Sequence, residues 1–307
     1  MGGSLALSST QPRPGSLRRP RAREALLAYG LIGPAVLVAL LVAVIPLCYA
    51  VWLSLQDWYL LRSPVPRWGG LINYRQLLQD GTLWSAFGRT WVWTLGTVFV
   101  EVVLAVPLAL LLNRDTPIAR GASALILLPW VTPFVVLGFG WRFLLDSNVG
   151  PIHAALHAVG IAGSSSVLND PVLAFATIIF ISGWKGTPFL AIALLAALKA
   201  IPDELYEAAE VDGAGWPARF WHITVPAVRN TTVTMALVLG ILAFYSFDLP
   251  WIMTKGGPQD ATTVIGIAMY KAIFLDLRPA YGAAISVVML VLLAIASLIA
   301  LGARKEA

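Results

Sequence analysis

The chain has 307 residues, of which 58% are hydrophobic and only 12% are charged, and its mean hydropathy is +0.79. Soluble domains carry about 25% charged residues, so this composition excludes an ordinary soluble protein. The net charge of +5 does not indicate nucleic-acid binding, because the basic residues flank apolar segments and form no single patch. The single cysteine, Cys48, excludes an internal disulfide.

Residues 1–24 form an arm rich in Ser, Pro and Arg, which we expect to be disordered. The segment that follows, residues 25–55, is apolar and uncharged. A cleavable signal peptide has an apolar core of only about 7–15 residues, so this longer segment is predicted to remain as a membrane helix. A membrane helix needs about 20 mostly apolar residues, and this segment exceeds that length.

Five further segments meet the same criterion, so we predict an all-α membrane protein with six transmembrane helices over residues 25–304. The five segments are residues 90–112, 121–141, 171–198, 231–247 and 280–303. Two of them carry one charge each, Glu101 and Lys185, and the other three are uncharged. A shorter apolar run, residues 261–270, is predicted to be an interfacial helix within a periplasmic segment, residues 251–279.

Positive charges set the predicted orientation, because cytoplasmic loops are enriched in Lys and Arg near the membrane. With six spans, twelve Lys and Arg residues fall on the side of the N-terminus and eight on the other side. The decisive group precedes the first span and consists of Arg13, Arg18, Arg19, Arg21 and Arg23. Both termini, and the loop of residues 199–229, are therefore predicted to be cytoplasmic.

The loop of residues 199–229 is polar and acidic, unlike the apolar segments on both sides. A helix is predicted to start after Pro202, since proline suits a first helical turn. Asp203, Glu207 and Glu210 form an acidic face of this helix. Leu205, Ala208 and Ala209 form a small apolar face. Gly213 can end it in a left-handed conformation. A second short helix is predicted over residues 217–222, after which Pro226 begins the return to the membrane.

Within this loop, the run Glu207-Ala208-Ala209 is followed at fixed spacing by Gly213, Ile223 and Pro226. This pattern resembles the EAA loop of ABC-importer permeases, although Val225 stands where that family usually has Leu. Residues 184–189, 197–214 and 254–263 resemble the carbohydrate branch, the permeases of the maltose and glycerol-3-phosphate type. The resemblance covers about residues 25–304 and implies a type I ABC importer permease fold in a bacterial inner membrane.

The resemblance also implies a set of partners. The chain would form a translocation path as a heterodimer with a second permease, together with two ATPase subunits and a periplasmic or lipid-anchored solute-binding protein. The substrate would be a sugar or polyol, with glycerol-3-phosphate as an alternative. In the family the EAA loop docks into the ATPase, so the matching residues are expected to couple to it: Glu207, Ala208, Ala209, Gly213, Ile223 and Pro226.

ATP binding is expected on a partner subunit, because the sequence contains no G-x-x-x-x-G-K-[ST] motif for a P-loop. The chain itself is therefore expected to be non-catalytic. We expect it to hold no cofactor and no metal, with ATP and Mg bound by the partner ATPase.

Charged residues within the spans are candidates for a substrate path, because a charge at the bilayer centre costs about 2.5–3.5 kcal/mol. Glu101 and Lys185, the latter preceded by Trp184, either form an ion pair, or only hold helices together or reach interfacial water. The end of the fifth span places aromatic rings beside polar groups that suit a sugar, namely Tyr245, Ser246 and Asp248. An aromatic belt at the membrane interface is the alternative for that region.

Two other classes of function remain open. A stand-alone secondary transporter needs coupling-ion groups at the midplane, for which Glu101 and Lys185 are a small set, and it leaves the acidic loop unexplained. A membrane enzyme needs clustered catalytic groups, and the acidic residues from 203 to 212 have no His or Cys among them. Co-purification of an ATPase with the solubilised chain would distinguish the importer from both.

Overall fold

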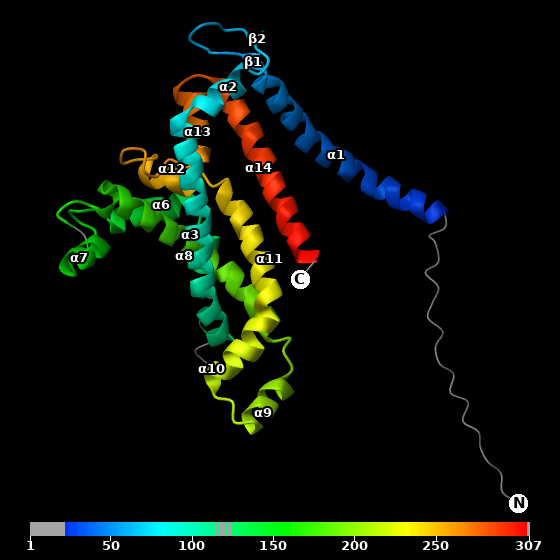
Figure 1. Ribbon diagram of the computed structural model, residues 1–307, viewed down its shortest axis with the longest axis vertical. Coiled ribbons are helices and arrows are strands. Elements are labelled where there is room, and N and C mark those ends of the chain that lie inside the picture. Colours follow the sequence, from blue (N-terminus) through cyan, green and yellow to red (C-terminus); the bar gives the residue numbers. More distant parts are fainter. Residues whose placement is uncertain (1–21, 115, 117–120, 122–124, 162, 306–307) are drawn as a thin grey trace, which may run out of the picture. The chain divides into compact units, whose positions relative to one another are not determined.

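The computed structural model describes residues 22–305, except 115, 117–120, 122–124 and 162 (Figure 1). The chain divides into two compact units, residues 1–49 and residues 50–307. Nearly all of the N-terminal arm expected over residues 1–24 lies outside the described residues. The fold is predominantly helical, as the composition predicts.

Helix α1 (Ala22–Ser54) is the described part of the first unit up to Tyr49, and its last residues belong to the second unit. Its segment Tyr29–Ser54 has a mean hydropathy of 2.7, which is high enough for a membrane helix. The helix predicted over residues 25–55 is confirmed, and it continues through Pro34 and Pro46. Neither proline ends the helix, as is common in membrane segments where freed backbone groups find other partners.

The second unit begins with a short connection that holds the chain in a fixed turn. Its elements are β1 (Gln56–Asp57), the antiparallel strand β2 (Arg67–Trp68) and α2 (Ile72–Gln79). The buried amide of Asn73 donates to the carbonyl oxygens of Ser54 and Gln56 at 2.9 and 2.6 Å. The hydroxyl groups of Ser54 and Tyr74 lie 2.7 Å apart, so α2 is bonded directly to the end of α1 within this unit.

Helix α3 (Gly81–Leu112) begins nine residues before the predicted start at residue 90. The reason is Asp80, whose side chain accepts hydrogen bonds from the backbone of Thr82 and Leu83 at 3.0 and 3.1 Å. A carboxylate at the N-cap satisfies amides that have no partner within the helix. Tyr281 also donates to Asp80 at 2.6 Å, which ties this cap to the last helix.

Four long helices form the core of the second unit: α3, α8 (Pro171–Leu198), α11 (Val225–Phe244) and α14 (Pro279–Lys305). Helix α8 has the predicted bounds, because Asp170 caps its first turn. Helix α11 packs on both α3 and α8 and also contacts α14 (Figure 1). One buried apolar cluster joins α3, α8 and α11, and it includes Ala105, Leu190, Leu194, Val228 and Leu239.

The contact between α3 and α8 depends on small residues. A Cβ atom added at Gly183 would lie 2.6 Å from the side chain of Val100 and 3.0 Å from the carbonyl oxygen of Thr97. A Cβ atom added at Gly186 would overlap the carboxylate of Glu101. Small residues at helix interfaces let backbones approach closely, which is the main source of packing energy between membrane helices.

The third predicted span, residues 121–141, is not one helix. It includes α5 (Leu128–Val131) and the first part of α6 (Phe134–Leu144), with a break between them, while residues 122–124 lie outside the description. Pro133 explains the break, since it has no N–H and forces the preceding Thr132 into an extended conformation with ψ of 126°. The length of an apolar run did not reveal this interruption.

Five helices of the described residues are therefore long and apolar enough to cross a membrane, and six spans are not confirmed. The five are Tyr29–Ser54, Gly81–Leu112, Pro171–Leu198, Trp216–Phe244 and Pro279–Leu298. Other short elements of the second unit are α7 (Pro151–Ala158), η1 (Val167–Asn169), α12 (Asp248–Thr254), α13 (Ile265–Tyr270) and η3 (Lys271–Leu275). Helix α13 corresponds to the short helix predicted over residues 261–270, and it starts four residues later.

Replacing Gly183 with valine should separate α3 from α8. We expect Gly183→Val to lower the free energy of unfolding by about 1–3 kcal/mol, because overpacking forces backbone shifts. Gly140→Val is the matched control, since the added group at that helical glycine meets nothing within 4 Å. Thermal unfolding of both variants in detergent measures the difference, and equal melting temperatures would contradict the close contact.

Candidate functional site

The loop of residues 199–229 contains a short exposed helix, α9 (Asp203–Val211). It begins where predicted, after Pro202, and its first turn carries Asp203 and Glu204. Acidic side chains at this end interact favourably with the helix dipole. The chain then leaves the helix through Gly213, whose φ of +78° confirms the predicted left-handed end.

No residue of α9 is buried. Glu207 and Ala208 are exposed and Ala209 is half-buried, so the acidic face and the small apolar face are both accessible. Two large apolar side chains of the same helix are also exposed, Leu205 by 51% and Val211 by 89%. An exposed face of mixed acidic and apolar character is suited to contact with another protein.

The segment after α9 differs from the prediction in one respect. Helix α10 (Trp216–Arg219), the π-helical turn η2 (Phe220–Thr224) and α11 run on as one continuous rod. Residues 217–222 are helical as predicted, but they are part of this rod and not a separate short helix, and Pro226 does not begin a new element. Pro226 cannot donate to His222, and a π-helical turn just before it accommodates that missing bond.

Two contacts brace α9 against this rod. Arg219 forms an ion pair with Glu210 at 2.8 Å, and the hydroxyl groups of Tyr206 and Thr224 lie 2.9 Å apart. Ile223 is half-buried in the rod, and Pro226 is exposed at the start of α11. The six predicted coupling residues thus follow one another along α9, the turn at Gly213 and the first part of the rod.

The two charged residues of the spans, Glu101 and Lys185, do not form an ion pair. Lys185 donates to the carbonyl oxygens of Pro129, Trp130 and Thr132 at the end of α5. Glu101 is 4% exposed and packs against α8 at Gly186. Its Oε2 atom is buried and has no hydrogen-bond partner among the described residues.

The predicted substrate-path residues near the end of α11 occupy different environments. Tyr245 is 50% exposed, Ser246 is half-buried, and Asp248 is exposed at the start of α12. Trp184 lies further away in α8, where its ring contacts Trp141 of α6 edge-on with centroids 5.7 Å apart. Tyr245, Ser246 and Asp248 therefore share one short connection, and Trp184 lies on another helix.

Beside this connection, four aromatic rings that the sequence did not reveal as a group lie in contact one after another, and we call them the aromatic stack, although only the first two rings are nearly parallel. The rings belong to Phe247, Trp251, Tyr270 and Phe274, and successive centroids lie 5.5, 4.5 and 4.9 Å apart. Phe247 and Trp251 are four residues apart in sequence, and so are Tyr270 and Phe274, which places the two rings of each pair on one helical face. That spacing is the only sequence signal, and it does not reveal that the two pairs meet.

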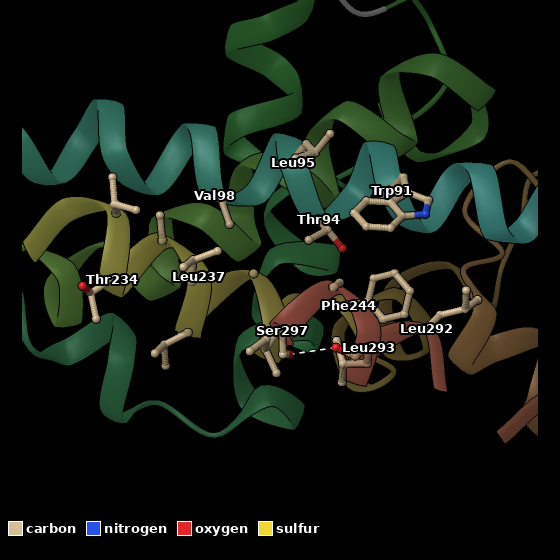
Figure 2. A pocket seen from close by; sticks show the side chains of 16 residues that line it. Trp91, Thr94, Leu95, Val98, Thr234, Leu237, Phe244, Leu292, Leu293 and Ser297 are labelled. Carbon is tan, nitrogen blue, oxygen red and sulfur yellow. Dashed lines mark hydrogen bonds between the residues drawn. The ribbon is translucent and has the colours of Figure 1, made fainter. Parts of the chain in front are cut away.

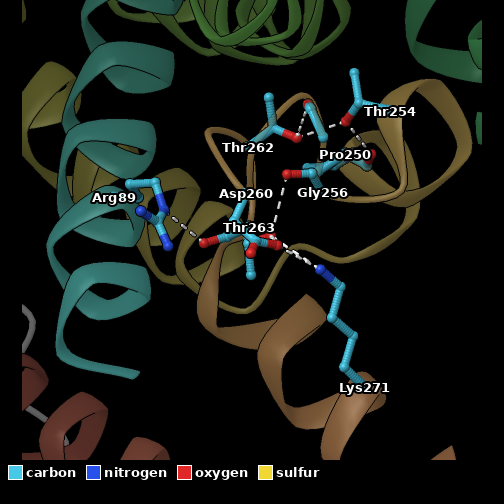
Figure 3. A network of polar contacts seen from close by, with 9 residues as sticks. Arg89, Pro250, Thr254, Gly256, Asp260, Thr262, Thr263 and Lys271 are labelled. Atoms are coloured by element: carbon cyan, nitrogen blue, oxygen red, sulfur yellow. Dashed lines mark hydrogen bonds and ion pairs between the residues drawn. The ribbon is translucent and has the colours of Figure 1, made fainter. Parts of the chain in front are cut away.

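A polar network fixes the segment between α12 and α13 against α3 (Figure 3). Arg89 donates through Nε to the carbonyl oxygen of Thr263 at 3.0 Å, and Lys271 contacts Asp260 at 2.6 Å. The hydrogen bond from Lys271, with a second from Thr263, holds the pKa of the Asp260 carboxyl below its ordinary value. The amide of Ile265 donates to Thr90 at 2.8 Å, so the network continues into the core.

A groove with a volume of about 470 Å³ lies between α3, α11 and α14 (Figure 2). Trp91 and Phe244 meet at one end, with ring centroids 5.3 Å apart. The hydroxyl groups of Thr234 and Ser297 are already bonded to backbone carbonyls of their own helices. The groove therefore offers few polar partners, and it does not suit a polar ligand such as a carbohydrate.

Five helices of membrane-spanning length among the described residues, together with an exposed acidic loop, are typical of a multi-pass membrane protein. Residues 64–304 match the family model described as "Binding-protein-dependent transport system inner membrane component", and the chain belongs to this family.

Curated relatives cover most of the chain. It is 33% identical over 271 residues to the sulfoquinovosyl glycerol transport system permease protein SmoG of Agrobacterium fabrum, covering 88% of this chain and 87% of that protein. It is 32% identical over 249 residues to the trehalose/maltose transport system permease protein MalF of Thermococcus litoralis, covering 81% and 84%. A third relative, the trehalose transport system permease protein SugA of Mycobacterium tuberculosis, is 31% identical, covering 87% and 85%.

A solved structure has the same fold. It is a bacterial alginate ABC transporter in complex with an alginate pentasaccharide-bound periplasmic protein, and one of its chains matches with a TM-score of 0.76. The match covers 91% of this chain and 93% of that one at 20% sequence identity. This similarity supports the ABC permease fold expected from the sequence.

The network around Asp260 predicts a dependence of stability on pH. Because the pKa of Asp260 is lowered in the folded protein, its contribution to stability is present above the ordinary carboxyl pKa of about 3.9 and is lost as the pH falls further. Asp260→Asn should therefore lose melting temperature relative to the parent at about pH 6 and approach it at about pH 3. Asp57→Asn, an exposed aspartate outside the network, is the control, and an identical response from both variants would contradict this assignment.

Proposed function

We propose that this chain is one permease subunit of an ATP-driven, binding-protein-dependent importer of a carbohydrate. Its partners are a second permease that completes a heterodimer, two cytoplasmic ATPase subunits and an external solute-binding protein. The chain lies in a bacterial inner membrane with both termini in the cytoplasm, and it is not itself an enzyme. ATP and Mg are bound by the ATPase subunits.

The observation that carries the proposal is the exposed helix α9 and its bracing to a continuous rod of membrane length. The ion pair between Arg219 and Glu210 and the contact between Tyr206 and Thr224 transmit force from α9 to the rod. The rod continues as α11, which packs on α3 and α8. A push or pull on α9 by a partner therefore moves helices of the transmembrane core.

Six side chains of the loop are assigned to the ATPase contact in this proposal. Small Ala208 and Ala209 allow close approach, and Glu207 meets basic or polar groups of the partner. Gly213 provides the sharp end of the helix, while Ile223 and Pro226 lie within the rod that follows. The exposed Leu205 and Val211 add apolar area to the same surface.

A sugar is the substrate class that the relatives favour. Three of them are named as permeases for sulfoquinovosyl glycerol, for trehalose and maltose, and for trehalose. A phosphate group such as that of glycerol-3-phosphate would need cationic donors, and the buried Lys185 already directs its ammonium at three backbone carbonyls. The carbohydrate importer is therefore preferred over a glycerol-3-phosphate importer.

The substrate path is assigned to the region where α11 ends. Tyr245, Ser246 and Asp248 supply hydroxyl and carboxylate groups, and the neighbouring aromatic stack supplies apolar ring faces. Sugars present both hydroxyl groups and apolar faces, so this combination suits them. Trp184, with Trp141, is assigned to the same path deeper in the core. Glu101 and Lys185 lie on α3 and α8, the helices that support this path.

A stand-alone secondary transporter is not favoured. Membership of a binding-protein-dependent family accounts for the acidic loop, which a secondary transporter leaves unexplained. The solubilised chain should therefore retain a bound ATPase through purification, and consistent absence of any ATPase would argue for the secondary transporter.

Reversing the charge at Glu207 should uncouple this permease from its partner ATPase. In membranes that contain the whole transporter, Glu207→Lys is expected to reduce substrate-driven ATP hydrolysis and transport by about tenfold or more, since a repulsive interfacial charge costs several kcal/mol. Asp276→Lys, the same reversal at an exposed residue outside the loop, is the control. Undiminished transport by Glu207→Lys would remove Glu207 from the coupling surface.

A further inference from the structure

Lys185 has an unusual set of neighbours for a buried charge. The residue is 8% exposed, and its ammonium nitrogen lies 3.1 Å from the carbonyl oxygen of Pro129, 2.9 Å from that of Trp130 and 2.7 Å from that of Thr132. An ammonium group has three N–H donors and no acceptor. All three donors are therefore used by backbone oxygens of one short segment, and none is left for a substrate or for Glu101.

These carbonyl groups need donors because α5 ends at the break. The carbonyl of Pro129 would be bonded to residue 133 in a continuous helix, but Pro133 has no N–H. The carbonyls at the C-terminus of a helix have no partner within it, and their dipoles favour a positive charge there. In a membrane core such a group is strongly unfavourable if it is left without a partner.

The surroundings of the ammonium complete a site for a cation. The ring of Phe134, the first residue of α6, lies beneath it, with 4.7 Å between Nζ and the ring centroid. An aromatic face within about 6 Å of an ammonium stabilises its charge. One helical turn beyond Lys185, Phe189 stacks on Trp130 with centroids 5.8 Å apart and an interplanar angle of 8°. Helix α5 is thus fixed to α8 at two neighbouring points.

We propose that Lys185 is a positioning residue whose ammonium group supplies the positive charge and the hydrogen-bond donors that stabilise the break between α5 and α6. It donates to the carbonyl oxygens of Pro129, Trp130 and Thr132 and lies over the ring of Phe134. This role replaces both an ion pair with Glu101 and direct contact with the transported molecule. The orientation of α6, and of Trp141 against Trp184, follows from the geometry of this break.

A direct consequence is that a small primary ammonium ion should occupy the site when the side chain is shortened. Lys185→Ala removes the propylammonium part of the side chain and leaves the carbonyl cluster without donors. Added propylammonium can supply both the charge and three N–H groups. Tetramethylammonium supplies the charge alone, and Lys185→Met fills the same space with an apolar chain.

The test is thermal unfolding of the full chain, purified in detergent with the subunits that accompany it. We expect Lys185→Ala to lower the melting temperature by at least about 3 °C, from the loss of bonds to buried groups. Propylammonium should restore at least half of that loss in Lys185→Ala, and tetramethylammonium should restore none. Lys185→Met should be lowered similarly and should not respond to either ion. Lys255→Ala, at an exposed lysine, is the control for loss of one ammonium and should melt as the parent does.

An unchanged melting temperature in Lys185→Ala, or equal responses to the two ions, would overturn the proposal. If Lys185→Ala fails to accumulate, Lys185→Gln provides the test, because its amide keeps N–H donors without the charge. Its melting temperature should lie between those of the parent and Lys185→Met, and a value equal to either would contradict the cation role. None of these measurements needs the transported molecule, so their failure leaves the proposed function intact.

Discussion

The close contact of α3 with α8 is the interaction on which the rest of the second unit depends. Glycine at positions 183 and 186 lets the two backbones approach, and a side chain at Gly183 would meet both Val100 and a backbone oxygen. Helix α11 rests on this pair, and Trp93 of α3 donates to the carbonyl oxygen of Ala243 near its end at 3.1 Å. The position of α11, and hence of the loop attached to it, is therefore set by the α3–α8 pair.

The same core explains how an exposed loop can act on the interior. Helix α9 has no buried residue of its own, yet α10, η2 and α11 form a single rod behind it. The rod passes along α3 and α8 and ends beside Tyr245, Ser246 and the aromatic stack. The proposed coupling surface is thus braced against one end of the rod, and the proposed substrate path lies at its other end, so the rod connects the two mechanically in the proposed importer.

Features governed by local chemistry could be predicted from the sequence. The bounds of α8 follow from an apolar run and an aspartate cap, and the start of α9 and its end at Gly213 follow from proline and glycine preferences. The break at Pro133 could not be predicted from the proline alone, because membrane helices such as α1 also continue through proline. The partners of Lys185 lie 53–56 positions away and are backbone carbonyls, which leave no trace in residue identity.

The central claim is that α9 is held by an ATPase on the cytoplasmic side of the membrane. A cross-linkable thiol at the exposed Ala208, introduced as Ala208→Cys with Cys48 replaced by serine, tests it most directly in membranes that contain the whole transporter. The account predicts a specific adduct with a nucleotide-hydrolysing subunit and protection from impermeant thiol reagents added outside the cell. Labelling of that cysteine from the outside, with no ATPase adduct, would contradict it.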